Sequence, residues 1–375
     1  MGKLVDSKYE EGFSKNDTQI VKGIAIIFML FHHLFRDPKR YTGYIVDCTP
    51  FPEPAINWVA ASFKICVAMF TFLSAYGITL NYRKLSAEYR FSGKDATRQS
   101  TRRLVSLLGG YEFLFWLIIL LDLFVIKSGR FVKIYGTGLR SVMNCLIDAA
   151  GLAKLVSLPN FLGTYWYMSL AIILIVLMPL LLKLYRSLGG AVVLFGSLLF
   201  YVLFPMTRDH QYAFLPNYLF SMVLGMVSAD QNLIVLMDQK LCRQNRLFCR
   251  ILSCSGGVLL VLGFLLLRQK GKDTFLMPIC DGLIAFLLCF VVYAGLGRIP
   301  VLKKVLEILG KYSMNIFLVH ELFRIIWCRD FIYSFQKWWL IFLVLFAVSF
   351  AAAVLIELLK KLLRYDRFVN WLRRS

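Results

Sequence analysis

The residues best suited to chemistry lie in one apolar stretch, residues 19–36, which reads QIVKGIAIIFMLFHHLFR. Ionisable groups inside a segment that is apolar enough to enter a bilayer are rare and usually tied to function. On a helix, His33 shares a face with Lys22, about 16 Å away along the axis, whereas His32 points about 100° away. A neutral imidazole in such a place can act as a general base. We therefore predict His33 as the catalytic residue.

Asp37 is the predicted partner of this histidine. It follows His33 by four residues, close enough at a helix end to accept a proton from one imidazole nitrogen and fix the tautomer of the ring. The alternative is that His32 and His33 are both amphipathic residues at the membrane interface. In that case Asp37 begins the turn at Asp37–Pro38 and has no role in chemistry.

The same stretch carries a family resemblance. A basic residue, a glycine, an apolar run and a histidine eleven positions after the basic residue resemble the first helix of the integral-membrane acyltransferase-3 family, the bacterial sugar O-acyltransferases. Three further stretches resemble this family in the same order: residues 67–80 (VAMFTFLSAYGITL), 164–182 (TYWYMSLAIILIVLMPLLL) and 309–320 (LGKYSMNIFLVH). The resemblance implies a single integral-membrane acyltransferase domain over residues 1–375.

The composition indicates a membrane protein. Of the 375 residues 59% are hydrophobic and 17% charged, whereas about a quarter of the residues in soluble domains are charged. The formal charge of +21 therefore points to basic loops at a membrane surface, and we expect no nucleic-acid partner. The nine cysteines are scattered, and their spacing supports neither a disulfide framework nor a metal site.

The apolar segments predict an all-α fold with about ten transmembrane helices around a polar interior passage. Each is close to the 20 residues that a spanning helix needs, and they lie at residues 19–36, 56–80, 104–126, 163–182, 190–206, 213–229, 251–267, 279–297, 305–326 and 338–359. Lysines and arginines are most frequent in the terminal segments and the even-numbered loops, which predicts that both termini are cytoplasmic. Residues 1–18 would then be a cytoplasmic tail and residues 360–375 a basic tail.

Basic residues at the cytoplasmic side predict a site for the acyl donor. Residues 81–103 form the most basic loop, and guanidinium groups bind phosphates in a bidentate manner. The alternative is that these charges bind anionic lipid headgroups. The family has a paired-arginine motif in this loop, usually closing on a proline, where this chain has Ser106. The resemblance therefore implies donor binding by Arg98, Arg102 and Arg103, and Lys22 would hold a phosphate or the pantetheine arm.

Two other segments are candidates for the acceptor side. Residues 127–162 form a long outer loop, in which residues 139–155 have the pattern of a short amphipathic helix on the membrane surface. The loop leads to Tyr165 and Trp166, which suit an interfacial aromatic belt or stacking on a sugar ring. The family has a similar tryptophan cluster and a similar serine and histidine later in the chain. These likenesses imply that Ser313 and His320 line the passage.

The function implied by the resemblance is transfer of a short acyl group, acetyl by preference, from cytoplasmic acyl-CoA to a hydroxyl of a cell-surface or lipid-linked sugar. Acyl-CoA would be a co-substrate, with no permanently bound cofactor and no metal. The bacterial plasma membrane is the expected location, with polysaccharide synthesis or export machinery as a candidate partner. One alternative is a transporter or glycan flippase, with Lys22, Lys64, Glu112 and His320 along its path. Another is a structural partner of a polysaccharide synthase, which would tolerate replacement of His33.

Overall fold

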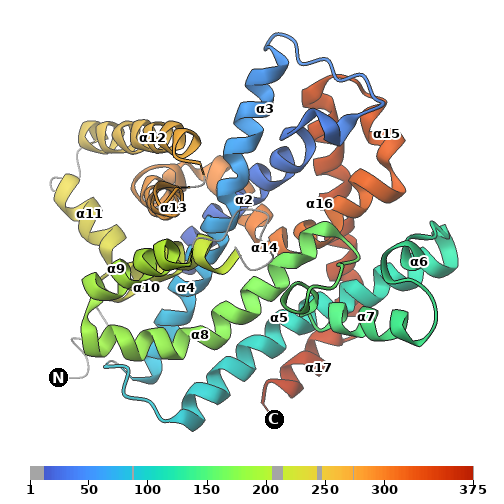
Figure 1. The fold of residues 1–375 in the computed structure, drawn as a ribbon. Helices are drawn as coiled ribbons and strands as arrows, with labels where there is room; N and C mark the ends of the chain where they lie inside the picture. Colours follow the sequence, from blue (N-terminus) through green and yellow to red (C-terminus); the bar gives the residue numbers. More distant parts are fainter. Residues whose placement is uncertain (1–11, 87, 205–213, 243–246, 273, 375) are drawn as a thin grey trace. The chain divides into compact units, whose positions relative to one another are not determined.

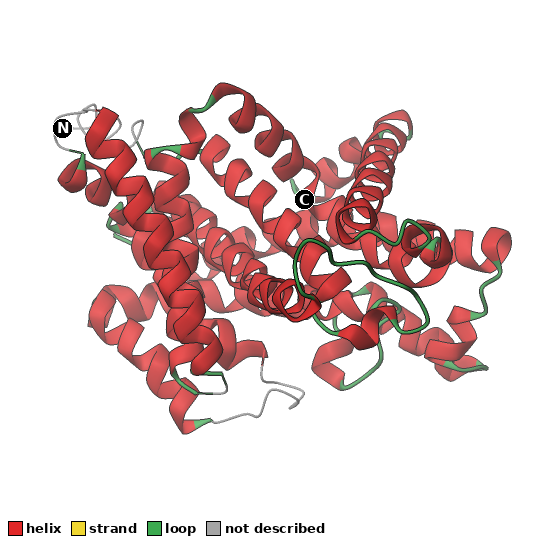
Figure 2. Cartoon of the chain, turned by 90° about the horizontal axis from the view of Figure 1, so that it is seen from above, coloured by secondary structure: helices red, strands yellow, loops and turns green. Residues whose placement is uncertain are grey.

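The computed structural model describes residues 12–86, 88–204, 214–242, 247–272 and 274–374 (Figure 1). Within these ranges the chain consists of helices and connecting loops (Figure 2), with one isolated bridge between Asp47 and Lys337. The predicted all-α fold is therefore confirmed. Residues 1–11 of the predicted N-terminal tail lie outside the described residues.

Several helices are suited to crossing a membrane. Seven candidates among the described residues are long and apolar enough: α2 (Lys15–Phe35), α3 (Glu53–Ser62) together with α4 (Cys66–Leu85), α5 (Gly93–Leu121), α8 (Trp166–Leu188), α12 (Leu247–Lys270), α13 (Leu276–Ala294) and α16 (Trp338–Leu362). An eighth arises if α10 (Phe214–Asp230) and α11 (Leu233–Leu241), which are bent by 67°, count as one span. The chain is thus a polytopic membrane protein.

The predicted count of about ten spans is not confirmed. Helix α9 (Gly190–Leu203) has 14 residues, so it is about 21 Å long, whereas a hydrocarbon core is about 30 Å thick. Helix α14 (Pro300–Leu322) is long enough, but its first half carries four charged residues, Lys303, Lys304, Glu307 and Lys311. The cytoplasmic placement of both termini and the polar interior passage stay predictions.

The chain divides into two compact units. Unit 1 contains residues 1–26, 65–91 and 177–311, and unit 2 contains residues 27–64, 92–176 and 312–375. In unit 1, α10 packs against α4 and α13, and α12 packs against α13. Gly225 permits close contact between α10 and α4. A Cβ at this position would collide with the carbonyl oxygen of Phe72.

Two other glycines bring α2 and α14 together within unit 1. A Cβ at Gly23 would collide with the carbonyl oxygen of Leu306, and a Cβ at Gly310 would collide with that of Gln19. Both obstacles are backbone atoms, which side-chain rotation cannot move away. The two helices continue into unit 2, where each carries a histidine ten residues after its glycine: His33 on α2 and His320 on α14.

Unit 2 is built around an aromatic core. Its helices also include α6 (Arg130–Tyr135), α7 (Leu139–Ala149), α15 (Arg329–Tyr333) and α17 (Tyr365–Leu372). The core joins α5, the start of α8 and the second half of α14 through fully buried side chains that include Tyr111, Phe115, Phe161, Tyr165, Leu318 and Leu322. Aromatic side chains bury large areas, so this core holds the elements around His320 in place.

A buried carboxylate fixes the long loop between α5 and α8. Asp148 Oδ2 accepts hydrogen bonds from the Tyr135 hydroxyl and from Phe161 N, both at 2.6 Å. Asp148 Oδ1 accepts another from Asn160 Nδ2 at 2.6 Å. A carboxylate with three donors ties together residues that are far apart in the loop. The end of the loop, next to Thr164, is therefore a fixed piece of backbone.

Candidate active site

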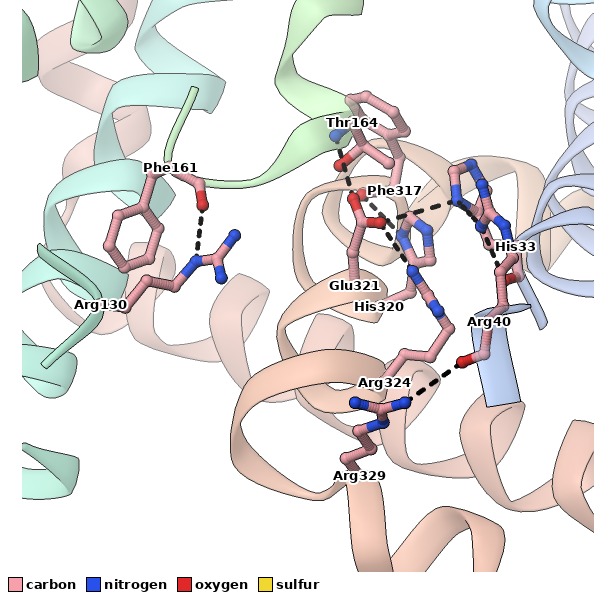
Figure 3. Close-up of polar contacts among 10 residues, drawn as sticks. All are labelled: His33, Arg40, Arg130, Phe161, Thr164, Phe317, His320, Glu321, Arg324 and Arg329. Atoms are coloured by element: carbon pink, nitrogen blue, oxygen red, sulfur yellow. Dashed lines mark hydrogen bonds and ion pairs between the residues drawn. The ribbon is translucent and has the colours of Figure 1, made fainter. Parts of the chain in front are cut away.

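The turn that follows α2 brings a second cation to His33. Asp37 has an extended backbone and accepts a hydrogen bond from Lys39 N at 3.0 Å, which caps a 3₁₀ turn at Pro38–Tyr41. This turn returns Arg40 towards the end of α2, where Arg40 Nη1 donates to the His33 carbonyl at 2.8 Å (Figure 3). The same nitrogen lies 3.3 Å from His33 Nδ1. The His33 side chain is 18% exposed.

Glu321 is the carboxylate nearest to His33 in the described part of unit 2. Its Oε1 lies 3.9 Å from His33 Nδ1 and accepts a hydrogen bond from Arg324 Nη2 at 2.8 Å. Its Oε2 accepts one from Thr164 N at 2.9 Å. Both oxygens therefore have a donor, as expected for a buried charge. The pairing with Arg324 favours the ionised form of the carboxylate.

His320 lies next to the His33 ring, on the same helix as Glu321. Its side chain is fully buried, and the centroids of the two rings are 4.9 Å apart. His320 Nδ1 donates to the Phe317 carbonyl at 2.8 Å, and because a carbonyl only accepts, the proton lies on Nδ1. His320 Nε2 then has a lone pair, and it has no hydrogen-bond partner among the described residues.

The tautomer of His33 depends on two neighbouring side chains, one a hydrogen-bond donor and the other an acceptor. Arg40 Nη1, a donor at 3.3 Å, favours a bare Nδ1. Glu321 Oε1 is an acceptor that would favour a proton there, but at 3.9 Å it is beyond hydrogen-bond distance. With the proton on Nδ1, the Nε2 atom of His33 is free to take a proton from a substrate. Burial and the neighbouring Arg324 guanidinium lower the pKa of Arg40 to about 10. Arg40 is therefore still charged at neutral pH.

A wider turn positions Arg324. Helix α14 ends at Leu322 and is followed by a π-helical turn at Phe323–Trp327. Such turns are uncommon and often lie at functional sites. Here the turn contains Arg324, whose side chain is 5% exposed and directed at Glu321. The Arg324 guanidinium is therefore held by its ion pair with Glu321, three residues earlier in the chain.

Comparison with known proteins decides the family. The acyltransferase-3 model, described as an acyltransferase domain, matches residues 17–358. The chain belongs to the acyltransferase-3 family. It is an enzyme of that family, and the match includes every residue of the His33 site. No curated protein and no solved structure matches the chain.

In this acyltransferase the structure brings two of the predicted site residues together, His33 and His320. The carboxylate at His33 Nδ1 is Glu321, while Asp37 caps the turn that carries Arg40. The sequence could have indicated Glu321 as a site residue, since it is an acidic residue directly after a histidine in an apolar segment. No sequence pattern indicates that Arg40 lies beside His33, because the position of Arg40 depends on the turn after α2.

The other predicted acceptor residues lie nearby in unit 2. The fully buried Tyr165 donates through its hydroxyl to the Leu318 carbonyl at 3.1 Å, so it packs the start of α8 against α14. Trp166 is half-buried and contacts the Tyr167 ring edge to face. Ser313 is buried on α14, seven residues before His320. Acceptor binding by these residues stays a prediction.

The predicted donor residues are divided between the units. Arg98 and Arg102 of unit 2 line a pocket of about 510 Å³, and Arg103 is half-buried on the same helix. Lys22 is half-buried on the part of α2 that belongs to unit 1. The pocket thus contains two of the three predicted arginines.

Proposed function

We propose that this family member is a membrane O-acyltransferase that moves a short acyl group, acetyl by preference, from acyl-CoA to a sugar hydroxyl. The acceptor would be a cell-surface or lipid-linked glycan at the bacterial plasma membrane. The observation that carries the proposal is the contact of a partly exposed histidine, His33, with the buried ion pair of Glu321 and Arg324. This arrangement resembles the histidine and carboxylate pair of other acyl-transfer enzymes.

In the proposed reaction His33 is the general base. In this step the Glu321 carboxylate closes from 3.9 Å to hydrogen-bond distance of His33 Nδ1 and displaces Arg40 from that nitrogen. His33 Nε2 then removes the proton of the acceptor hydroxyl while the hydroxyl oxygen attacks the thioester carbonyl. A carbon–oxygen bond forms, the carbon–sulfur bond breaks, and the imidazolium returns its proton to the leaving thiolate. The negative charge of Glu321 stabilises the imidazolium that forms between these steps.

Glu321 replaces Asp37 as the proposed orienting carboxylate. Asp37 is engaged by Lys39 N, whereas Glu321 Oε1 lies 3.9 Å from the ring nitrogen that must carry the proton. Thr164 N and Arg324 hold the Glu321 carboxylate from two directions. A carboxylate held in this way favours one tautomer of His33. Glu321 is thus a positioning residue in the proposal, and His33 is the catalytic one.

The remaining roles follow the sequence prediction. Arg98, Arg102, Arg103 and Lys22 bind the donor, and Tyr165, Trp166, Ser313 and His320 line the acceptor side. Phosphate groups of the donor suit the first set, because guanidinium groups match phosphate geometry. The flat faces of aromatic rings suit sugar rings in the second set.

The test compares two adjacent histidines. His33→Asn is expected to lower the rate of acetyl transfer by about 10²- to 10⁴-fold, the usual contribution of a general base. His32→Asn is the matched control, because His32 is 4% exposed and its Nδ1 lies 2.7 Å from the Ala60 carbonyl, away from Glu321. Both variants are assayed with acetyl-CoA in vesicles and for glycan acetylation in cells, at equal amounts of folded protein. Full activity of His33→Asn would exclude this base.

A further inference from the structure

A basic pocket in unit 2 is built from two segments far apart in the sequence. One is the first turns of α5, and the other is the end of α17. The pocket has a volume of about 510 Å³ and is lined by Gly93, Lys94, Thr97, Arg98, Thr101, Arg102, Leu372, Arg373 and Arg374. The sequence prediction included only the α5 side, so the contribution of Arg373 and Arg374 is new.

Helix α17 is held against α5 by specific contacts (Figure 1). The Tyr365 hydroxyl donates to the Gly109 carbonyl at 3.1 Å, and the Tyr365 ring contacts the Phe113 ring with centroids 4.7 Å apart. A Cβ at Gly109 would lie 2.9 Å from Val369 Cγ2, so the glycine permits close packing at this point. These contacts fix the end of α17, and with it Arg373 and Arg374, beside α5.

The charges of the pocket favour an anion with several negative groups. Lys94 and four arginines line it, and none of the described lining residues is acidic. The nearby Asp95 is engaged by the Ser92 side chain in the cap of α5. Like charges gathered at one place repel each other unless an anion compensates them. The N-terminus of α5 adds partial positive charge, and the hydroxyls of Thr97 and Thr101 can donate hydrogen bonds.

We propose that α17 completes a phosphate-binding site, in which Arg373 and Arg374 face Arg98 and Arg102 across the phosphate groups of the acyl donor. The ligand class is a nucleotide-bearing thioester with several phosphates, and this part rests on the proposed function. Anionic lipid headgroups carry the same chemistry, so the experiment includes both sources. The C-terminal helix is then part of the donor site, and not only a membrane-surface segment.

The first experiment is the double substitution Arg373→Gln/Arg374→Gln in the full chain, in vesicles of zwitterionic lipid. The KM for acetyl-CoA is expected to rise about 10- to 100-fold with little change in kcat, since two charge-assisted contacts are lost. The KM for S-acetylpantetheine, which has no phosphate, is the internal comparison and should match that of the parent. An unchanged KM for acetyl-CoA would overturn the proposal.

Direct binding of coenzyme A, measured by titration calorimetry, separates this proposal from the proposed reaction. If the parent binds coenzyme A and the double variant binds it about ten-fold more weakly or worse, the pocket is supported even where no sugar accepts the acyl group. If the parent does not bind coenzyme A, the proposal fails. If the double variant loses only a stabilisation by phosphatidylglycerol, and its coenzyme A affinity is unchanged, the pocket binds lipid headgroups and the donor assignment is wrong.

A second pair of variants tests whether donor binding requires α17 to be packed against α5. Gly109→Leu is expected to displace Val369 and α17, and so to raise the KM for acetyl-CoA as the double substitution does. Gly110→Leu is the matched control, because a Cβ there meets nothing within 4 Å. Thermal unfolding of both variants shows whether they are folded. Equal KM values for the two glycine variants and the parent would show that the placement of α17 does not matter.

Discussion

The rings of His33 and His320 meet edge to face with centroids 4.9 Å apart, although one belongs to α2 and the other to α14. The Nδ1 proton of His320 is already directed at a backbone carbonyl. His33 Nδ1 lies between a donor and an acceptor. The two imidazoles therefore differ in how their tautomers are set, and their substitutions should have different effects.

Substitution of His320 tests this difference. If His320 lines the acceptor side, His320→Asn should raise the KM for the acceptor and lower kcat less than about ten-fold, far below the 10²- to 10⁴-fold expected of a base. Steady-state kinetics with both substrates gives the separation. A loss of kcat as large as that of His33→Asn would instead assign the base to His320, whose Nε2 lone pair is free.

Glu321 and Asp37 can be compared with matched amide substitutions. Glu321→Gln is expected to lower kcat by about 10-fold to 10⁴-fold, because the amide no longer favours the productive tautomer of His33. It also leaves Arg324 without its ion pair, at a cost of about 3–5 kcal/mol in unfolding free energy. Asp37→Asn keeps an oxygen for Lys39 N and should retain the rate.

The double variant Glu321→Gln/Arg324→Gln separates stability from chemistry. It removes the uncompensated buried charge, so thermal unfolding should recover part of the loss. The rate of acetyl transfer should remain low. If Asp37→Asn were the slower of the two single variants, the assignment of Glu321 would be wrong.

Arg40 predicts a pH dependence of stability. Burial, and then the Arg324 guanidinium, lower the pKa of Arg40 from its ordinary higher value in the unfolded chain to about 10 in the folded protein. Between these values the unfolded chain binds more protons than the folded one, so the free energy of unfolding rises with pH. The melting temperature of the parent, relative to that of Arg40→Gln, should therefore increase between about pH 9.5 and about pH 12. A constant difference over this range would contradict the buried position of Arg40.

The hydrogen bonds accepted by Asp148 predict that its substitution destabilises the loop between α5 and α8. Asp148→Asn has one carbonyl oxygen for three donors, and its amide nitrogen must face one of them. The unfolding free energy should fall by about 1–3 kcal/mol for the unsatisfied group. The variant Arg140→Gln, at an exposed position on the same helix α7, should change it by less than about 0.5 kcal/mol. Thermal unfolding and proteolysis of the loop are the measurements.

The close contact at Gly310 predicts that no larger side chain is tolerated at this position. Gly310→Ala should lower the unfolding free energy by about 3 kcal/mol or more, because the obstacle is the backbone of Gln19. Gly196→Ala on α9, where a Cβ meets nothing within 4 Å, should be neutral or stabilising by up to about 1 kcal/mol. A stable Gly310→Ala variant would show that α2 and α14 are not this close.

The sequence allowed some of these features to be predicted, for reasons that particular residues make clear. His33 could be selected as a candidate because an imidazole in an apolar helix has few structural explanations, and its catalytic role stays a prediction. The partner Asp37 was inferred from a four-residue spacing, which holds only while the helix continues. Helix α2 ends at Phe35, and Asp37 has an extended backbone with φ −149°. Periodicity does not encode the turn that follows, so Arg40 could not be predicted.

The predicted number of about ten spans is not confirmed, for a related reason. Apolar segments at residues 190–206 and 305–326 were counted by hydropathy alone. The helix in the first is short, and the helix that contains the second begins earlier, in a charged segment. Helix boundaries depend on caps and turns that are difficult to place from apolar runs.

The hydrogen bond from Thr164 to Glu321 comes from a backbone N–H, and any amino acid except proline supplies that donor. Side chains in the loop before Thr164 can therefore be substituted while this backbone hydrogen bond to Glu321 is kept. Grafting residues 136–147 from a related enzyme, with Tyr135 and Asp148 retained, would show whether this loop takes part in the proposed acceptor binding.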